Sequence, residues 1–496
     1  MKETLPPAAP PPGSIPGEAP PPAAGTEPSS LIALRPLLWL VAAGVFMQML
    51  DSTIVNTALP SMARDLNQSP LKMQAVVVAY SLTVAMLIPA SGWLADRFGT
   101  RRLFITAIAV FTLGSLACAI SQTLPQLVGS RVLQGVGGAM LLPIGRLAVL
   151  RAVPRKDFLA AMSFVTVPGL IGPLIGPTLG GWLAEVASWH WIFLINLPLG
   201  VLGTLAALRW MPDLRGPQMR FDAWGYVLLA FGMVAISLSL DSLSEADARR
   251  GFMLVLLVFG LAGLVAYWLH AARAPRPLFS LALFKVPSFR IGLLGNLFSR
   301  MGSSGMPFLI PLMLQVALGY SPMNAGLMMI PAALAGMGSK RIVVPLVHRL
   351  GYRKVLVGNT ILVGLAMASF ALISPEWPLW LHLIQFGCFG AVNSLQFTAM
   401  NTLALRDLDG DLASSGNSLL SMTMMLAMSI GVAVAGSLLG VFGNEALHPL
   451  RDQALGAFRW TFVCVGLITM ASATIFAQLP PTRRIPPASV KRADAA

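Results

Sequence analysis

Long apolar runs recur along almost the whole chain and constrain its fold more than any other feature. A helix that crosses a bilayer needs roughly 20 mainly apolar residues, and runs near that length recur about fourteen times from Pro36 onward. Only 11% of the residues are charged, whereas soluble domains carry roughly 25%. The sequence therefore predicts an all-α polytopic membrane protein with 14 transmembrane helices. The predicted spans are 36–59, 73–94, 102–121, 125–150, 158–185, 189–211, 222–240, 251–271, 288–316, 323–343, 354–373, 377–403, 413–441 and 457–478.

The basic residues follow the pattern of membrane topology rather than that of a nucleic-acid surface. The formal net charge is +14, but nucleic-acid binding needs Lys and Arg gathered on one accessible face, and here they lie in short loops between apolar runs. The loops on the side of the chain ends are rich in them, whereas the alternate loops hold few. Because Lys and Arg accumulate in cytoplasmic loops, we expect both termini in the cytoplasm and no nucleic-acid partner.

An internal repeat divides the membrane part into two related halves. A loop in each half carries the same basic and glycine residues at an offset of 252 residues. The first set is Arg97, Gly99 and Arg101, and the second is Arg349, Gly351 and Arg353. The same offset carries Ser69-Pro70 onto Ser321-Pro322. Related halves with a substrate site between them at mid-membrane are a transporter design.

These features together predict the domain organisation. Residues 1–35 are rich in Pro, Ala and Gly and are expected to form a disordered cytoplasmic tail. A six-helix bundle is expected at 36–212, two inserted helices at 213–285, a second six-helix bundle at 286–480 and a short cytoplasmic tail at 481–496.

One carboxylate lies well inside an apolar run. Asp51 is the only one of the 20 Asp and Glu residues so placed, with Glu185 and Asp241 the nearest exceptions. A charge at the bilayer centre costs roughly 2.5–3.5 kcal/mol on insertion scales, so such a residue is by default a functional-site candidate. The plainer alternative is a polar residue satisfied within the helix bundle.

A basic residue is expected at a similar depth. Arg131 falls about two turns inside the fourth span, and Asp51 lies nine residues from the outer end of the first, which at 1.5 Å per residue gives similar depths. The two could pair or compete for a proton, because a guanidinium favours the charged carboxylate and burial favours the neutral one. Alternatively, Arg131 only ties helices together, since buried charges are usually paired.

The fifth span combines evenly spaced glycines with three prolines. Gly172, Gly176 and Gly180 recur every four residues and form a smooth face that another helix can approach closely. The prolines remove backbone donors and permit bending. Glycines at this spacing, taken alone, often indicate only packing.

Two of these stretches resemble motifs of the major facilitator superfamily. The loop after the second span is similar to a cytoplasmic signature, which in the family latches the two bundles together in the outward-open state. Its matching residues are Gly92, Leu94, Asp96, Arg97, Gly99, Arg101 and Arg102. Within it, Asp96 is expected to cap a helix start or to pair with Arg97 or Arg101. The fourth span resembles a motif associated with proton coupling, at Arg131, Gln134 and Gly135.

Two further stretches resemble motifs of the drug:proton antiporters with fourteen helices, a branch of the same superfamily. The fifth span is similar to their antiporter signature, which marks exporters, at Gly172, Gly176, Pro177, Gly180 and Gly181. Ser163 stands where the family has an earlier glycine. The first span resembles their first-helix motif at Asp51, Thr53, Asn56, Ala58 and Pro60, and the runs 188–196 and 412–421 are also similar to members of the branch. The resemblance implies a bacterial inner-membrane protein.

The sequence argues against an enzyme. Five scattered histidines, no Gly-rich phosphate loop and no sizeable soluble domain leave nothing to bind ATP, and the three cysteines lack metal-ligand spacing. We therefore expect no cofactor and no metal. Transport must then use an ion gradient, so we predict a monomeric proton antiporter for small molecules, with Asp51 as the proton carrier and multidrug efflux as the role. A channel or sensor would need neither the Gly/Pro helix nor the isolated carboxylate.

The substrate class has an alternative. The candidate substrate-pathway residues are Asn56, Gln134, Asn296 and Arg300. The interiors of the last six spans hold no carboxylate, whereas Arg300 lies mid-span and Lys340 near a span end. A net positive cavity would suit an organic anion such as citrate or a metal-citrate chelate. Alternatively, Arg300 and Lys340 are structurally paired or extend to the membrane interface.

Overall fold

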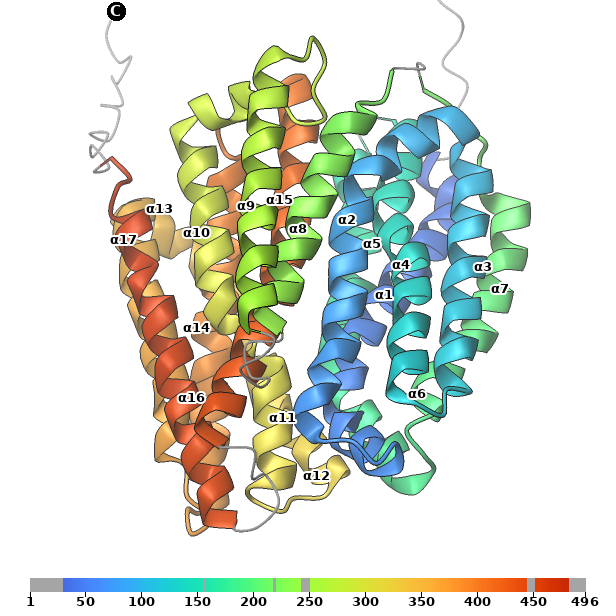
Figure 1. Cartoon of the computed structure of the whole chain (residues 1–496). Helices are drawn as coiled ribbons and strands as arrows, with labels where there is room; N and C mark the ends of the chain where they lie inside the picture. Colours follow the sequence, from blue (N-terminus) through green and yellow to red (C-terminus); the bar gives the residue numbers. More distant parts are fainter. Residues whose placement is uncertain (1–29, 155–156, 217–219, 242–249, 444–450, 481–496) are drawn as a thin grey trace, which may run out of the picture.

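The computed structural model describes residues 30–154, 157–216, 220–241, 250–443 and 451–480. All regular elements in these ranges are helices (Figure 1), which confirms the predicted all-α fold. Helix α1 begins at Ser30, so residues 30–35 belong to the first helix rather than to the predicted tail. The rest of that tail and the tail predicted at 481–496 lie outside the described residues.

The N-terminal half consists of α1 to α7 and supplies six candidate membrane crossings. Local signals set its helix boundaries: the Thr123 hydroxyl accepts a hydrogen bond from the Gln126 amide at the start of α4, as expected for a helix N-cap. The crossing predicted at 189–211 is divided between a short helix and a longer one. The elements are α1 (Ser30–Asp65), the 3-10 turn η1 (Pro70–Met73), α2 (Gln74–Phe98), α3 (Thr100–Ala119), α4 (Leu124–Ala152), α5 (Phe158–Val186), α6 (Trp191–Leu194) and α7 (Asn196–Trp210).

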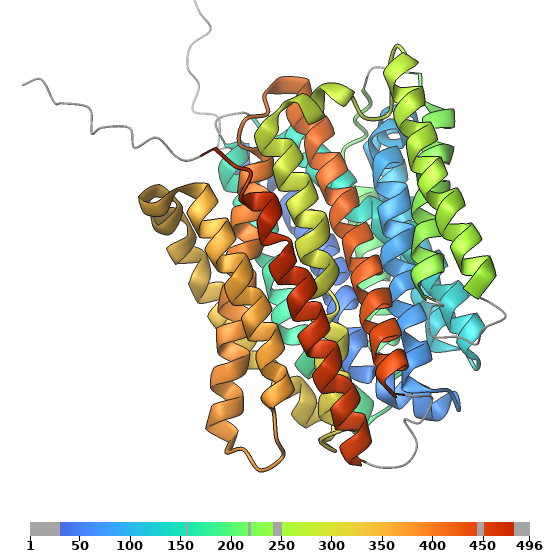
Figure 2. The ribbon, with the colours of Figure 1, turned by 60° about the vertical axis from the view of Figure 1, so that its left-hand side comes forward.

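Two helices, α8 (Ala223–Asp241) and α9 (Arg250–Arg273), lie between the halves in sequence. They pack against each other, and α8 also packs against α2 and α15 along one flank of the molecule (Figures 1 and 2). Ser237 and Ser429 share a hydrogen bond of 2.8 Å, and Ser437 donates to the Leu240 carbonyl at 2.7 Å. The inserted pair is therefore fastened to the C-terminal half by specific bonds.

The C-terminal half consists of α10 to α17. Its helices are shown in yellow to red in Figure 1 and come forward in Figure 2. The elements are the 3-10 turn η3 (Leu281–Lys285), α10 (Pro287–Ser303), α11 (Met306–Val316), α12 (Pro322–Leu327), α13 (Ile330–Ala368), the 3-10 turn η4 (Ser369–Leu372), α14 (Leu379–Leu405), α15 (Gly410–Gly443), α16 (Arg451–Ala471) and α17 (Ala473–Phe476).

The ninth predicted span, 288–316, is not a single helix. Helix α10 ends at Ser303 and α11 begins at Met306. The run of Gly and Ser at 302–305 has weak helix propensity, and Pro307 has no amide hydrogen to bond the Ser303 carbonyl. The crossing predicted at this point is therefore formed by two successive helices.

The helices of the described residues are consistent with the fourteen predicted crossings. Eleven segments are long and apolar enough to span a membrane. One of them, Pro322–Leu372, contains two predicted crossings, because its backbone leaves the helical region at Gly351. Helix α14, with 27 residues, and the α10–α11 pair occupy the remaining two predicted positions.

The sequence repeat has a counterpart in the backbone. Gly99 adopts φ 88° and ψ 148°, and Gly351 adopts φ 77° and ψ 157°, conformations that L side chains rarely reach. Each thus permits the sharp turn between two crossings. Ser69 and Ser321 likewise both stand in extended conformation as N-caps whose side chains accept an amide hydrogen bond. Loops 252 residues apart in the sequence therefore have the same local geometry.

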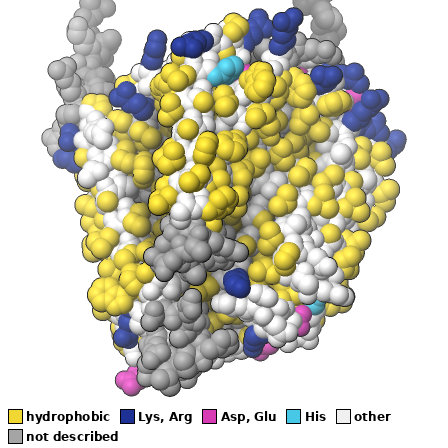
Figure 3. All heavy atoms as spheres, viewed as in Figure 1, with side chains coloured by type: hydrophobic (Ala, Val, Ile, Leu, Met, Phe, Trp, Pro, Cys, Tyr) yellow, Lys and Arg dark blue, Asp and Glu magenta, His cyan; other side chains and the backbone are white. Residues whose placement is uncertain are grey.

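The molecule has a basic end, which we define as the end where α1 begins, α17 ends and α2 turns into α3. Lys and Arg side chains gather there (Figure 3). At the opposite end, one buried apolar cluster joins the halves, combining Met62 and Phe193 with Phe308 and Phe370. The fully buried residues of the cluster around Phe104 all belong to the N-terminal half, and Met425 of α15 packs against them. Leu82 of α2 lies in a further cluster with residues of α8 and α15, so the halves are also joined along α2.

Candidate functional site

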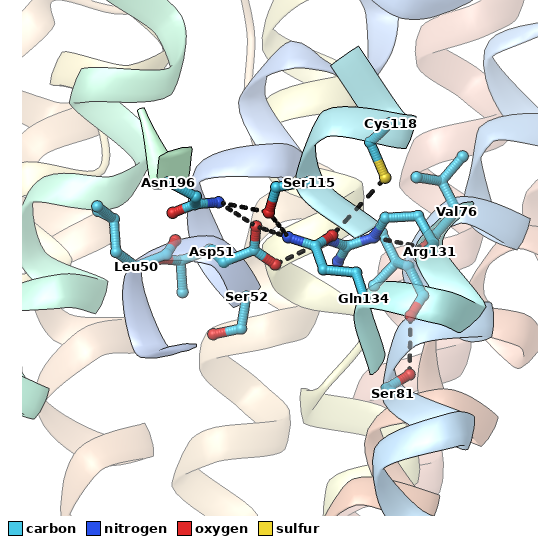
Figure 4. Close-up of polar contacts among 12 residues, drawn as sticks. Leu50, Asp51, Ser52, Val76, Ser81, Ser115, Cys118, Arg131, Gln134 and Asn196 are labelled. Carbon is cyan, nitrogen blue, oxygen red and sulfur yellow. Dashed lines mark hydrogen bonds and ion pairs between the residues drawn. The ribbon is translucent and has the colours of Figure 1, made fainter. Parts of the chain in front are cut away.

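Asp51 is the centre of a buried polar network that joins five helices of the N-terminal half, α1, α2, α3, α4 and α7. Its side chain is 0% exposed. Oδ2 accepts a hydrogen bond from Nη1 of Arg131 at 2.7 Å, and Oδ1 accepts from Nε2 of Gln134 at 2.7 Å and from Nδ2 of Asn196 at 3.1 Å (Figure 4). All three neighbours are donors, which is the environment that a charged carboxylate requires.

Arg131 has further hydrogen-bond and aromatic partners besides Asp51. Nη1 also donates to Oε1 of Gln134 at 2.6 Å, and Nε donates to the Val76 carbonyl at 3.3 Å. The guanidinium lies 4.2 Å from the centre of the Tyr80 ring and 5.8 Å from that of Phe193, so it also makes cation–π contacts. The expected pairing of Arg131 with Asp51 is thus present in a site closed to solvent.

The network contains residues that the sequence analysis did not select. Ser115 of α3 accepts from Gln134 at 2.8 Å and from Asn196 at 3.3 Å, and Cys118 contacts Gln134 with its thiol at 3.7 Å. Gln134, predicted on the substrate pathway, therefore has its whole amide engaged by the Asp51 network. Asn196 carried a usable signal, because it is an amide inside an apolar span and ends the run 188–196.

The glycine face of α5 packs against α1 directly beside Asp51. A Cβ at Gly172 would lie 2.8 Å from the Leu50 nitrogen, and Cβ atoms at Gly176 and Gly180 would collide with Thr53 and with the Ile54 carbonyl. The spacing of these glycines therefore permits a helix contact that no larger residue could make.

The outer part of the same helix closes the seam between the halves. Gly181 lies against the Pro322 carbonyl of α12, so a Cβ there would collide with it. The Thr178 hydroxyl donates to the Gly326 carbonyl at 3.2 Å, and the Met323 amide donates to the Glu185 carboxylate at 2.9 Å. The antiporter-type segment thus contacts Asp51's helix with one stretch and the C-terminal half with the next.

The loop that resembles the latch signature, residues 92–102 (the latch-type loop), makes a different ion pair from the one expected. Asp96 pairs with Arg151 of α4, rather than with Arg97 or Arg101, because those side chains are directed elsewhere. Arg97 lies over the Trp93 ring, and Arg101 donates to the Leu208 carbonyl. The prediction for Asp96 was wrong because the α4 end is brought beside the loop only by tertiary packing.

The remaining residues of the latch-type motif have varied roles. Gly99 forms the turn with positive φ, whereas a Cβ at Gly92 would meet open space. Arg102 lies in the first turn of α3 and is exposed.

The predicted substrate-pathway residues do not form one cluster. Arg300 of α10 donates through Nε to Oδ1 of Asn296 at 3.2 Å and lies 4.5 Å from the centre of the Phe397 ring. Asn296 donates in turn to Asn401 at 3.3 Å. Asn56 is buried in α1, where its amide contacts only the Ser52 carbonyl among the described residues, at 3.5 Å. No carboxylate pairs with Arg300 in the described ranges.

The arrangement supports movement of a proton more readily than bond chemistry. Asp51 can change charge, and Arg131 responds to that change directly. Among the described residues, no group of three or more His, Cys, Asp or Glu side chains is arranged to hold a metal ion.

Comparison with protein families identifies the fold. The sequence model of the Major Facilitator Superfamily matches residues 41–432. The chain belongs to the major facilitator superfamily. Since this is a family of transporters, the protein is a membrane transporter and not an enzyme, as predicted.

Curated relatives of this superfamily member cover almost its whole length. A protein of Pectobacterium atrosepticum is 51% identical over 92% of this chain and 97% of its own, and one of Cronobacter sakazakii is 53% identical over 89% and 94%. Both bear the name of a candidate multidrug resistance protein, MdtD. The relatives are bacterial, as the sequence resemblance implied.

Solved structures of transporters share the major facilitator fold of this chain. A bacterial homologue of the lysosomal transporter Spinster aligns with a TM-score of 0.64 at 14% identity, covering 91% of this chain and 97% of its own. A D-xylose–proton symporter aligns with a TM-score of 0.63 at 14% identity, covering 90% and 98%. These similarities support the fold alone.

Proposed function

We propose that this transporter is a proton-coupled antiporter that exports small molecules, with Asp51 as the proton carrier. The observation that supports this role is the Asp51–Arg131 pair, 2.7 Å apart and closed to solvent inside membrane-spanning helices. Burying two charges costs several kcal/mol even when they are paired, so such a pair is poorly explained as a stabilising element. Ionisable residues within membranes mark ion or substrate pathways.

The coupling follows from the neighbours of the pair. Protonation of Asp51 removes the charge that holds Arg131, and a change at α1 is transmitted to α5 because the glycine face packs on that stretch. Helix α5 in turn contacts α12 across the seam. Proton binding from outside therefore favours one arrangement of the halves, and substrate binding follows proton release.

Orientation and substrate class are further parts of the proposal. We place the basic end and both termini in the cytoplasm of a bacterium, with the protein as a monomer in the inner membrane, because Lys and Arg accumulate on the cytoplasmic side. We assign multidrug export because relatives about half identical to this chain over nine-tenths of its length bear that name.

An organic anion is the second candidate substrate. The observation that favours it is Arg300, whose charge is offset by a ring and an amide rather than by a carboxylate within the described residues. A positive charge without a counter-ion attracts anions. Citrate and metal-citrate chelates belong to this class.

The deciding experiment reconstitutes the protein in proteoliposomes with a trapped pH dye. Proton flux is measured on adding a lipophilic dye cation and, separately, on adding citrate. We expect flux with the cation, abolished in Asp51→Asn and retained in the exposed control Glu376→Gln. Flux with citrate alone would replace multidrug export by anion export, and proton-coupled export retained in Asp51→Asn would exclude Asp51 as the carrier.

A further inference from the structure

Of the three side chains that donate to Asp51, Asn196 alone has a buried polar atom without a partner among the described residues. Its Nδ2 donates to Asp51 and to Ser115, at 3.1 and 3.3 Å. Its Oδ1 is buried and has no hydrogen-bond partner. Leaving a buried acceptor unsatisfied costs on the order of 1–3 kcal/mol. The arrangement that serves the charged carboxylate therefore leaves the Asn196 amide with one unsatisfied acceptor.

A protonated Asp51 needs a hydrogen-bond acceptor, which the present arrangement does not offer it. The carboxylic acid has an O–H that must find an acceptor, whereas the neighbours now direct three donors at the carboxylate. Oε1 of Gln134 cannot serve readily, because it already accepts from Arg131 at 2.6 Å. Of the two amide oxygens on the donors to Asp51, only Oδ1 of Asn196 remains free among the described residues.

We propose that Asn196 is a positioning residue that reverses its amide when Asp51 takes up a proton. A half turn about the bond to the amide carbon exchanges Nδ2 and Oδ1, which brings Oδ1 to the place 3.1 Å from the carboxylate. There it accepts the Asp51 O–H. Ser115 can follow, because a hydroxyl that now accepts can donate instead. Each protonation state of Asp51 thus has an Asn196 hydrogen bond of the polarity that it needs.

The position of Asn196 suits this role. It is the first residue of α7, next to the turn at Ile195 that separates α6 from α7. The same segment is tied to the end of α1, because Trp189 donates to the Asp65 carboxylate at 2.8 Å. Residues 189–196 are therefore bonded to α1 at both ends, so a change in the bond between Asn196 and Asp51 can move this segment relative to α1.

The other titratable groups near Asp51 are few. They are Tyr80 on α2, Cys118 on α3 and Arg131 on α4. The packed helices α6, α11 and α12 have none, α5 has Glu185 only near its far end, and α7 has Arg209 only in its last turn. A pH response of the Asn196 amide is thus attributable to Asp51.

The inference rests on the proposed role of Asp51 and is tested with Asn196→Leu, which keeps the volume but removes both polar atoms. Leu removes the donor to the charged form together with the acceptor for the neutral form, so we expect the midpoint of the pH profile of proton-coupled transport to stay close to that of the wild type. If the amide only donated, Leu would remove a bond to the charged form alone and move the midpoint about one pH unit toward alkali. Asn196→Ser, which can still donate and accept, is expected to keep most of the wild-type profile. Asn359→Leu is the matched control, a buried amide of the other half.

Infrared difference spectra on acidification supply a readout that a purely structural role would not move. With asparagine isotopically labelled, we expect an amide carbonyl band that shifts together with the carboxylic band of Asp51 and is lost in Asn196→Leu. If Asp51→Asn abolishes coupling while Asn196→Leu moves the midpoint toward alkali and the amide band does not shift on acidification, the amide reversal is wrong and the carrier role stands. If Asp51→Asn keeps coupling, the carrier role itself fails.

Discussion

The two halves share their turn geometry but bury different kinds of polar groups. The N-terminal half buries a charged pair, Asp51 and Arg131, with amides around it. The C-terminal half buries a neutral network, in which Asn359 donates to Gln396 at 2.8 Å and Gln396 donates to Thr360 at 2.6 Å. Among the described residues of these two networks, only the first contains ionisable groups.

The offset of the repeat sharpens this difference. Moved by 252 residues, Asp51 falls on Ser303, where α10 ends. One half thus has a carboxylate in an unbroken helix, and the other has a helix break at the equivalent place. Arg300, one turn before that break, lies against Phe397 and Asn296. The comparison is consistent with our proposal that the N-terminal half carries the proton, and it leaves the C-terminal half for substrate contacts in that proposal.

Removing the guanidinium from each half gives the largest expected contrast. Arg131→Met leaves Asp51 as a buried charge without its partner, so we expect a loss of about 3–5 kcal/mol in the free energy of unfolding. Arg300→Met removes no ion pair and is expected to cost under about 1 kcal/mol. Thermal unfolding in detergent measures both. Adding Asp51→Asn to Arg131→Met should recover most of the loss, and equal losses in the two single variants would contradict the comparison.

The glycines of the two halves give the next contrast. Gly176→Ala places a methyl group against Thr53 of α1, and we expect about 1–3 kcal/mol of destabilisation from overpacking. Gly338 of α13 faces open space, so Gly338→Ala should stabilise the helix by up to about 1 kcal/mol. The same unfolding assay reports both values. Destabilisation by both substitutions would show that the α1–α5 contact is not special.

The neutral network supplies a smaller effect that separates stability from coupling. Gln396→Leu breaks bonds to Asn359 and Thr360 and is expected to cost about 1–2 kcal/mol. Its pH profile of transport should match that of the wild type, since none of these side chains titrates. A displaced profile would mean that the C-terminal half also takes part in proton coupling.

The Asp222 carboxylate just before α8 gives the smallest effect and a scale for the buried pair. Burial alone would raise the pKa of Asp222, but hydrogen bonds from the Gly225 amide, the His270 ring and the Leu278 amide lower it below its usual value. Its stabilisation is therefore present above the unfolded-state pKa near 4 and is lost as the pH falls through the lower folded-state pKa. We expect Asp222→Asn to cost about 1 kcal/mol at neutral pH, because the amide oxygen of Asn can still accept from one of the backbone amides that now bond the carboxylate.

The control for this prediction is the pH dependence itself. Unfolding midpoints of the wild type and Asp222→Asn, measured from pH 7 down to pH 3, should converge in acid. A difference that persists unchanged at pH 3 would show that the carboxylate charge is not the source of the effect.

The sequence predicted the membrane crossings well because the signal is local. A run of apolar residues is visible without knowing its neighbours, and so is a single carboxylate such as Asp51 inside it. The break between α10 and α11 was missed, although Pro307 and the Gly and Ser residues before it were visible. An apolar run that still reads as one crossing conceals a break in its helix.

The sequence alone thus determined the helical membrane fold, the position of Asp51 and the glycine face of α5, because each depends on residues within one span. Only the tertiary structure decided the contacts between spans. It placed Asn196 and Ser115 beside Asp51 and paired Asp96 with Arg151. Arg151 lies 55 residues from Asp96, and Asn196 lies 145 residues from Asp51. The residue pattern of one helix does not indicate which face of another helix packs against it.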